Sequence, residues 1–581
     1  MQQIRNEKYT AHLNAYYYYH EYVKKISDEE TDIFPRDTPT ENPKICIIGA
    51  GATGLFSALL LKEAGINDIT ILEVQDRIGG RIHTHYFTDD PDDERRLYGE
   101  LGAMRLPYVD GRPDLSPHQI VFDTIDYLNE YNKDDPKKQI RTIPFIFRDS
   151  DSISYFNGKK DPSGKFMTKN YSETADVSKL GYPDTIPPNF VKLWNEALKP
   201  FFDELNTDYT KGLKALKRYD QYSVYSYLKE VFLPARLPTK WEDYDEIIAA
   251  IELQVTGTNE FTKGFVDFAI GTFTFGNPNY PLSWKTIDKG MQRFPNAFLP
   301  FIKKEKIDLR YNSEVYKIEK TDDGKNVKVY WNSKGKKEFE IFDRVIVTPP
   351  LGVVRHWDLP LTLSYGKKRA IRELKYLNAG KIFLQFKSRF WEKEGQPTTS
   401  GAGIVGGTTS TDLPVRTVVY PSYYQGLSTN GSGVLLASYT WDDDATKFSP
   451  YSEEERFELA LKDLVTLHGE IAYEEWIPGK ENNKAHYWSN DKTVVGGAYA
   501  KYGPAQLGKL MESMMRSEEF IHWAGEHTDI HNAWIAGALN SAVRVVREIL
   551  LENLMKDRWL KLKNSRLLKY WNGNLEAFEG Y

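Results

Sequence analysis

One stretch near the N-terminus decides the fold: KICIIGAGATGLFSALLLKEAGINDITILE, residues 44–73. Its apolar pattern predicts a short buried strand at Lys44–Gly49, a helix at Gly51–Ala64 and a second strand at Ile69–Glu73. A strand–helix–strand order of this kind builds parallel sheets. The run Ile45–Leu61 is close to the length of a membrane span, but its spaced glycines favour a turn between strand and helix.

The turn after the first strand carries a G-x-G-x-x-G motif made by Gly49, Gly51 and Gly54, with Ala52 and Thr53 between the last two. Such glycines allow a tight turn and let a pyrophosphate approach the helix N-terminus closely. The motif alone is weak evidence. Glu73, however, ends the next strand, where a carboxylate can accept hydrogen bonds from a ribose diol. The two features together predict a dinucleotide site.

A second glycine pair extends this unit. Glu73 and Val74 are followed by Arg77, Gly79, Gly80 and Arg81. Gly80 lets the backbone lie against a second phosphate, and Arg81 can neutralise its charge. A plain turn with two surface arginines would explain the glycines but not the carboxylate beside them.

These residues resemble the monoamine oxidase and L-amino acid oxidase family of flavoproteins. The resemblance implies that the run holds the ADP half of FAD and that the backbone of Val315 binds the adenine. Covalent members of the family attach the flavin through a cysteine near the C-terminus. The only cysteine here is Cys46, so we expect FAD to be bound non-covalently.

The segment Glu100–Pro107 resembles the G-x-M-R segment of L-amino acid oxidases. The resemblance implies that the backbone of Gly102, Ala103 and Met104 meets the flavin and that Arg105 binds the substrate carboxylate. A buried guanidinium needs a partner, and a planar carboxylate is its natural bidentate one. An internal pair between Arg105 and Glu100 is the alternative.

The C-terminal region resembles the family's second signature, with GEHT at residues 525–528 and AWIAGA at residues 533–538. The resemblance implies that Glu526 binds the ribityl chain and that the start of the last helix points its N–H groups at the isoalloxazine ring. Trp534 would wall the substrate cage. Ala533 stands where snake-venom members have glycine. The expected cofactor contacts here are Gly525, Glu526, Ala533, Trp534, Ile535 and Ala538, and the expected substrate contacts are Ala533 and Trp534.

Two further residues match the family by local context. Lys381 matches the lysine that reaches flavin N5 through a water and acts in the oxygen reaction, where a positive charge stabilises superoxide. Tyr420 matches the tyrosine that donates a second hydrogen bond to the substrate carboxylate. The alternatives are a surface lysine at a strand end and a core tyrosine.

We therefore expect an α/β protein of mixed α+β character, with a Rossmann-type FAD-binding domain, a mixed-sheet substrate domain and a helical subdomain. The polar stretch 149–188 predicts a long surface excursion, and residues 327–342 predict a hairpin. The expected division is an N-terminal helix and linker at 1–42, FAD-binding segments at 43–107, 283–355 and 519–560, substrate segments at 108–189 and 356–518, the helical subdomain at 190–282 and a C-terminal tail at 561–581.

Composition narrows the possible partners. The chain has 581 residues, of which 27% are charged, and its net charge of −6 offers no basic field for nucleic acid or an anionic membrane. One cysteine can build neither a disulfide nor a cysteine metal cluster, and we expect no metal. Residues 1–41 lack a signal-peptide core, which favours the cytoplasm and leaves secretion open. Family members are often dimers, and no segment here identifies such an interface.

The resemblance implies oxidation of a free L-amino acid. Hydride passes from Cα to flavin N5, the imine hydrolyses to a 2-oxo acid and ammonia, and O2 takes the electrons to give hydrogen peroxide. Three alternatives remain: an amino acid 2-monooxygenase that releases CO2 and an amide, a monoamine or polyamine oxidase, and a non-catalytic protein such as the escorts of prenylated GTPases. Glu252, Glu260 and Asp267 could contact a basic substrate side chain, or could be solvated charges.

Overall fold

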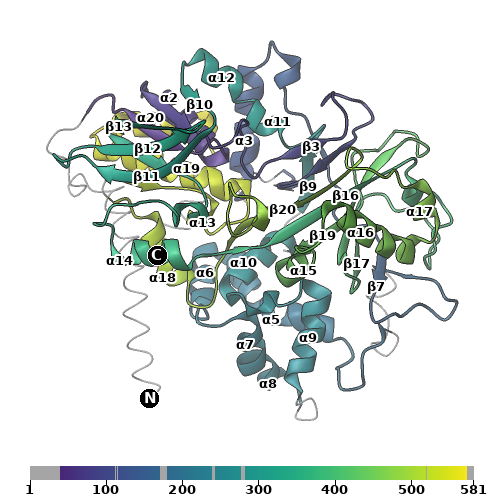
Figure 1. The fold of residues 1–581 in the computed structure, drawn as a ribbon. Coiled ribbons are helices and arrows are strands. Elements are labelled where there is room, and N and C mark those ends of the chain that lie inside the picture. Colours follow the sequence, from purple (N-terminus) through teal and green to yellow (C-terminus); the bar gives the residue numbers. More distant parts are fainter. Residues whose placement is uncertain are drawn as a thin grey trace.

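The computed structural model describes residues 40–571, apart from 112, 114–115, 170–179, 239–242, 277–281 and 519 (Figure 1). The helix expected within residues 1–42 lies outside the described residues. Within the described ranges, none of the helices is both long enough and apolar enough to cross a membrane.

A parallel sheet of five strands forms the first layer, in the order β10-β2-β1-β14-β22. Its strands come from three separated parts of the chain: β1 (Ile45–Ile48), β2 (Ile69–Leu72), β10 (Asp308–Arg310), β14 (Arg344–Val347) and β22 (Ile521–Trp523). The two central strands β1 and β2 are buried along their whole length. Parallel strands need helices on their faces, and α2 (Ala52–Glu63) and α19 (Ile535–Glu552) pack against each other in the same core. The strand–helix–strand unit is confirmed.

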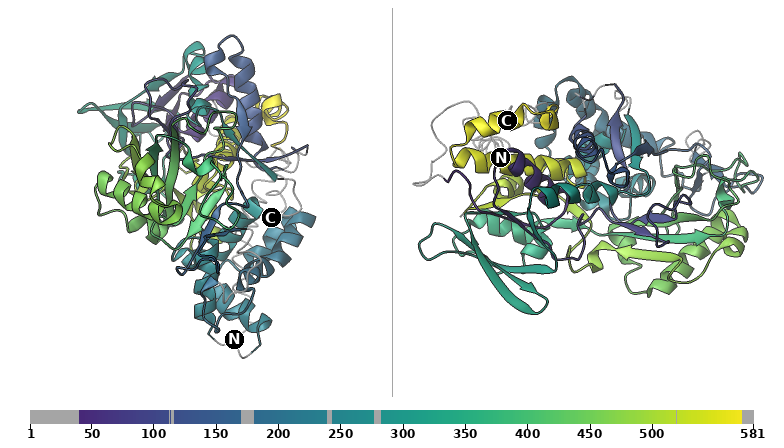
Figure 2. Two further views of the ribbon diagram at one scale, coloured as in Figure 1. Left: turned by 90° about the vertical axis from the view of Figure 1, so that its right-hand side faces the viewer. Right: turned by 90° about the horizontal axis from the view of Figure 1, so that it is seen from above.

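A small antiparallel sheet, β11-β12-β13, extends from this layer, and Figure 2 shows it at the edge of the molecule in the view from above. It contains β11 (Ser313–Lys320), β12 (Val327–Ser333) and β13 (Lys336–Phe342). The turn between β12 and β13 places Lys334 and Gly335 at positive φ, which is the backbone that tight hairpins favour. The predicted hairpin is confirmed.

A mixed sheet of seven strands forms the second layer, in the order β20-β16-β19-β18-β17-β7-β8. Its strands are β7 (Ile153–Tyr155), β8 (Met167–Thr168), β16 (Ala379–Phe386), β17 (Thr408–Thr411), β18 (Thr417–Val419), β19 (Gly433–Trp441) and β20 (Asn483–Tyr487). β7 pairs with β17 in parallel, and the other neighbours are antiparallel. The prediction that residues 149–188 form only a surface excursion is therefore wrong. Ile153 and Phe166 are buried in this sheet's core, although polar neighbours hide them in the sequence.

Helices fill the region from residue 190 to 276, and Figures 1 and 2 show them grouped at one end of the molecule. The helical spacing predicted for residues 190–256 is confirmed, and α10 extends the region. The helices are α5 (Phe190–Thr207), α6 (Tyr209–Lys217), α7 (Val224–Tyr227), the π-helix η4 (Leu228–Phe232), α8 (Leu233–Arg236), α9 (Tyr244–Val255), the 3₁₀ turn η5 (Glu260–Thr262) and α10 (Phe265–Gly276).

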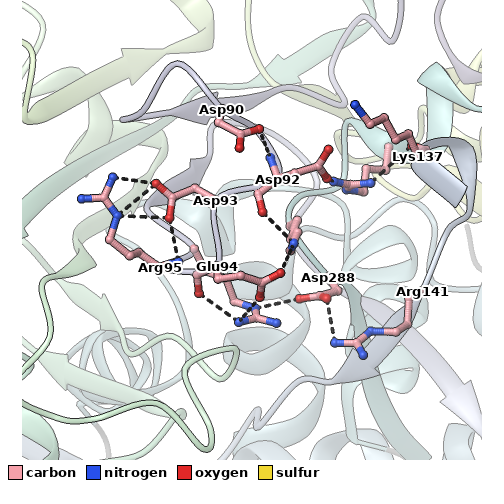
Figure 3. Close-up of polar contacts among 11 residues, drawn as sticks. Asp90, Asp92, Asp93, Glu94, Arg95, Lys137, Arg141 and Asp288 are labelled. Carbon is pink, nitrogen blue, oxygen red and sulfur yellow. Dashed lines mark hydrogen bonds and ion pairs between the residues drawn. The ribbon is translucent and has the colours of Figure 1, made fainter.

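The loop between β3 (Thr84–Tyr86) and β4 (Tyr98–Glu100) is held by ion pairs, and Figure 3 shows its acidic residues and their partners. Arg96 binds Asp288 at 2.9 Å, Arg141 binds the other oxygen of Asp288 at 2.7 Å, and Lys289 binds Glu94 at 2.6 Å. Asp288 follows β9 (Leu282–Ile287), whose partners are β5 (Leu106–Val109) and β6 (Thr142–Pro144). Arg96, just before β4, is bound to Asp288, just after β9, and β5 pairs with β9. The segment that links β4 to β5 is therefore anchored to the region of β9 at both ends.

The C-terminal part is more ordered than a tail. α20 (Lys556–Lys563) and the turn η9 (Arg566–Leu568) follow α19, and Trp571 packs edge-on against Trp559 at 5.7 Å. Both tryptophans belong to the core that contains α2 and α19. The prediction of a tail from residue 561 is wrong as far as Trp571, because single apolar residues rather than a periodic run attach this segment.

The remaining elements connect these layers. They are α3 (Gln119–Tyr131), η2 (Pro136–Lys138), α11 (Arg293–Asn296), α12 (Leu299–Lys304), α13 (Leu351–Val354), α14 (Tyr365–Glu373), β15 (Lys375–Leu377), η6 (Phe390–Glu392), α15 (Asp442–Thr446), α16 (Glu453–His468), α17 (Ile471–Glu475), η7 (Trp488–Asn490), β21 (Tyr499–Lys501), α18 (Leu507–Met515) and η8 (Glu526–Thr528).

Candidate active site

A cavity of about 580 Å³ is lined by residues of the parallel sheet layer, the seven-stranded sheet and the helical region. Most of the residues predicted for the site lie on its wall. Gly54, Val315 and Tyr420 do not. Those on the wall are Gly49, Gly51, Ala52, Thr53, Glu73, Val74, Gly80, Arg81, Gly102, Ala103, Met104, Arg105, Lys381, Gly525, Glu526, Ala533, Trp534, Ile535 and Ala538.

The three glycines of the first turn have different tasks. Gly49 has a φ of +101°, which favours glycine. A Cβ on Gly54 would come within 1.9 Å of the carbonyl oxygen of Gly49, so this glycine lets the helix pack closely on the strand. A Cβ on Gly51 would meet nothing within 4 Å, and no side chain caps the N–H groups at the start of α2. The helix therefore presents free N–H groups beside open space, as an anion site requires.

Glu73 is held rigidly beside this turn. Its two carboxylate oxygens accept hydrogen bonds from the N–H of Ala50 at 2.7 Å and the N–H of Gln75 at 2.9 Å. Burial raises its pKa, and these backbone hydrogen bonds act against that rise. Each oxygen keeps further acceptor capacity toward the cavity, which suits a ribose diol.

Arg81 and Glu526 join the two ends of the chain at the cavity wall. Nη1 of Arg81 lies 2.7 Å from Oε1 of Glu526 and 3.0 Å from the carbonyl oxygen of Ala498. Oε2 of Glu526 accepts from the N–H of Ala533 at 2.9 Å. Ala533 has a φ of +66°, a backbone conformation that a glycine adopts with less strain.

Lys381 lies beneath the segment that follows β4. Its Nζ donates to the carbonyl oxygens of Glu100 at 2.8 Å and Gly102 at 2.7 Å. Burial lowers the pKa of Lys381 to about 7, with the carboxylate of Glu100 acting against the change. A surface lysine is therefore excluded, because Lys381 is buried within β16.

The carboxylate of Glu100 has other partners than Arg105. It accepts from the hydroxyl of Thr84 at 2.9 Å and from the N–H of Met291 at 2.7 Å. Burial raises its pKa to about 7. The alternative of an internal Arg105–Glu100 pair is wrong.

Arg105 instead lies among aromatic rings. Its guanidinium carbon is 4.8 Å from the ring centre of Phe147, 5.1 Å from that of Phe275 and 5.7 Å from that of Trp284. Within the described ranges it has neither a hydrogen-bond acceptor nor a carboxylate at ion-pair distance. Burial lowers its pKa, but an arginine stays protonated at any ordinary pH. The wall therefore carries a fixed, unpaired cation.

Trp534 continues the aromatic wall at the start of α19. It is the N-cap residue of this helix, and no side chain caps the free N–H groups there. Its ring lies 5.0 Å from His118, edge-on, and 5.3 Å from Phe275. The cavity thus has a second uncapped helix start, next to the aromatic box around Arg105.

The prediction that Tyr420 faces this site is wrong. Its hydroxyl is bonded to Thr409 at 3.0 Å and His468 at 2.9 Å, in the core of the seven-stranded sheet. The physical reason is the alternation of side chains in an extended chain. Val419 packs with Met104, and the next residue turns to the opposite face.

Several wall residues were not found from the sequence. Tyr439 lies opposite Lys381 in the pairing of β16 with β19, and its ring centre is 4.7 Å from Nζ of that lysine. The candidate acid Glu260 lies on the wall as well, whereas Tyr499, Phe147, Phe275 and His118 were not predicted. They come from unconnected segments without a shared motif, so only the pairing register could have identified Tyr439.

Comparison with known proteins gives the family. Residues 52–550 match the flavin containing amine oxidoreductases. The chain belongs to this family. L-amino-acid oxidase from Siganus canaliculatus is 31% identical over 517 residues, which cover 88% of this chain and 86% of that protein. L-amino-acid oxidase 4 from Hebeloma cylindrosporum is 30% identical over 582 residues, which cover 95% of this chain and 87% of that protein. A protein of Dictyostelium discoideum described as a bifunctional amine oxidase is 32% identical over 525 residues, or 87% of this chain and 46% of that longer protein.

Solved structures agree on the fold. Putrescine oxidase bound to putrescine has a TM-score of 0.59 at 17% identity, covering 88% of this chain and 100% of that one. Cyclohexylamine oxidase from Brevibacterium oxydans has a TM-score of 0.60 at 14% identity, covering 88% of this chain and 99% of that one. The expected α/β flavoprotein fold is confirmed, and the chain is an oxidoreductase.

Changing Gly54 or Gly51 to alanine should have different effects. Gly54→Ala forces a methyl against a backbone oxygen at 1.9 Å, so we expect flavin-free protein to lose roughly 1–3 kcal/mol of unfolding free energy. Gly51→Ala meets open space, so stability stays within about 0.5 kcal/mol while the methyl weakens flavin binding. Denaturant unfolding and flavin absorbance measure the two. Equal loss of stability in both variants would contradict the different roles given to Gly54 and Gly51.

Proposed function

We propose that the protein oxidises the amine of a free L-amino acid, using non-covalently bound FAD and O2, to give a 2-oxo acid, ammonia and hydrogen peroxide. One observation carries the proposal: the unpaired guanidinium of Arg105 on the cavity wall. A buried charge without a partner is costly. A substrate carboxylate would provide the missing partner with bidentate geometry.

The carboxylate separates this substrate class from simple amines. The relatives named L-amino-acid oxidases are named for substrates that carry a carboxylate. Putrescine and cyclohexylamine, for which the solved structures are named, carry none. A cation facing such amines would repel them. Arg105 therefore favours an amino acid as the substrate of this chain.

The residues on the wall fit FAD. The start of α2 at Ala52 would take the pyrophosphate, Glu73 a ribose, and Glu526 with the start of α19 the flavin end. When bound, FAD would supply the acceptor for the hydride removed from Cα and the route by which both electrons reach oxygen. Cys46 is buried in β1, away from the wall, which supports binding without a thioether link.

Protein groups around Arg105 would orient the zwitterion. Tyr439 and Tyr499 line the same cavity and replace Tyr420 as hydroxyl groups available to the substrate. Burial raises the pKa of both tyrosines, and Arg105 acts against that rise. They remain neutral donors. Trp534 and Phe275 exclude water from the side of the reacting carbon.

Lys381 would hold a proton near the reacting atoms. Two carbonyl oxygens fix its Nζ, and its depressed pKa allows it to exchange a proton near neutral pH. A charged Lys381 would stabilise the negative charge that oxygen acquires when it accepts an electron.

The direct test is an assay of the purified holoprotein with the twenty L-amino acids. We expect flavin absorbance, peroxide and a 2-oxo acid in equal amounts with ammonia. An amide and CO2 instead would select a 2-monooxygenase. Turnover of tyramine or spermine without turnover of amino acids would select a monoamine or polyamine oxidase.

Arg105→Leu should lower kcat/KM for amino acids by roughly 10²- to 10³-fold, because a bidentate charge-assisted contact is lost. Arg105→Lys should recover only part, since it keeps the charge without the fork. Steady-state peroxide assays measure both. Arg148, an exposed arginine that also lines the cavity, provides the control, and Arg148→Leu should change little. Unchanged kinetics in Arg105→Leu would remove Arg105 from the site.

Lys381→Met should slow the reaction of the reduced enzyme with O2 by about 10²-fold, because the cation is lost. Reduction by the substrate should change far less. In the unchanged protein, the oxygen rate constant should fall as pH rises through about 7, since Lys381 loses its proton there. Stopped-flow mixing with oxygen measures this. A Met variant that keeps the same pH profile would exclude Lys381.

A further inference from the structure

One acidic side chain on the cavity wall has no task in holding the cofactor. The carboxylates among the wall residues of the described ranges are Glu73, Glu526 and Glu260, and the first two belong to the flavin segments. Glu260 begins η5, in the link between α9 and α10, and only 7% of it is exposed. It comes from the helical region, whereas Glu73 and Glu526 follow strands of the parallel sheet.

The carboxylate of Glu260 is only half satisfied. Its Oε2 accepts from the hydroxyl of Thr256 and from the N–H of Gly257 at 3.4 Å. Oε1 has no hydrogen bond and no ion pair with any residue that the structure describes. In a largely buried residue on a cavity wall, such a free oxygen can accept a hydrogen bond from a ligand in the cavity.

Lys501, which also lines the cavity, is already paired with another carboxylate. Nζ of Lys501 lies 3.1 Å from Oδ2 of Asp267, whose Oδ1 accepts from the side-chain amide of Asn532 at 2.7 Å. Lys501, Asp267 and Glu260 together carry one positive and two negative charges. Because Lys501 pairs with Asp267, an ionised Glu260 leaves these three groups with a net charge of −1. Burial raises the pKa of Glu260 to about 7, and Lys501 acts against this rise without cancelling it.

The same cavity connects this carboxylate to Arg105. Burial raises the pKa of Tyr499, Glu260 adds to the rise, and Arg105 opposes it; Tyr439 responds to the same two charges. Both tyrosines line the same cavity as the cation and the anion. α10 runs along the cavity wall. Its Phe275 contacts Arg105, and its Phe268 contacts Lys501 at 4.9 Å. These two positions are about 10 Å apart along the helix axis, which suits a long side chain.

We propose that Glu260 selects amino acids with a long cationic side chain, such as lysine or arginine, by pairing its free carboxylate oxygen with the substrate cation. This inference rests on the proposed function, which places the substrate carboxylate on Arg105. Glu252 and Asp267, the other two acids noted in the sequence, are not on the wall. Glu252 instead accepts from the N–H of Phe261 at 2.6 Å.

The test compares the holoenzyme on L-lysine, L-arginine and L-norleucine, which has the chain of lysine without its ammonium group. We expect kcat/KM for lysine or arginine to exceed that for norleucine by at least about 10-fold. Glu260→Gln keeps the shape and removes the charge. It should lower kcat/KM for the basic substrates by roughly 10²-fold, mainly through KM, and change that for norleucine less than about threefold.

Glu252→Gln is the matched control, a half-buried acid in the same region that should leave the ratio of basic to neutral substrates unchanged. Equal losses on lysine and norleucine in Glu260→Gln would overturn the proposal, because the residue would then only support the fold. A wild-type enzyme without preference for the basic substrates would overturn it as well, even if the variant failed to bind flavin. Turnover of neutral amino acids alone refutes this inference, whereas no turnover of any amino acid refutes the proposed function.

Discussion

The ion pair between Arg81 and Glu526 holds the site together. It joins two segments that are far apart in the sequence at a distance of 2.7 Å, on the wall of the cavity that both segments line. Glu526 also accepts from the N–H of Ala533 and so fixes the start of α19. The hydroxyl of Thr53 donates to the carbonyl oxygen of Ala538 at 3.0 Å and links α2 to the same helix. Both uncapped helix starts are therefore set by contacts between the first and last thirds of the chain.

Against this frame the charges of the cavity have separate roles. Arg81 and Glu526 neutralise each other, and Lys381 is held by two carbonyl oxygens. Arg105 and Glu260 are buried charges of the wall without an ionic partner among the described residues, whereas Glu73 is held by backbone N–H groups and Arg148 is exposed. Their opposite signs match a zwitterion with a second cation. Under the proposed function, these two charges would face the substrate rather than the cofactor.

The sequence predicted what local motifs determine. Three features are each encoded within a few residues, so their spacing predicted them: the turn at Gly49–Gly54, the place of Glu73 after the second strand, and the start of α19. Contacts between distant segments were not predictable in this way. Phe147, Phe275 and Trp284 surround Arg105 from three separate places in the chain. Tyr420 was assigned to the wrong face of its strand, because the sequence shows that side chains alternate but not which face meets the cavity.

The single thiol of the protein also has a consequence. Cys46 lies in the middle strand of the parallel sheet with no exposed surface, and burial raises its pKa strongly. Oxidation of cysteine requires an accessible thiolate. Under the proposed function the protein would be exposed continuously to the hydrogen peroxide that it forms, and its buried cysteine would offer that oxidant no reactive thiol. Inactivation by peroxide during turnover would then begin with oxidation of thioethers, such as that of Met104 on the cavity wall.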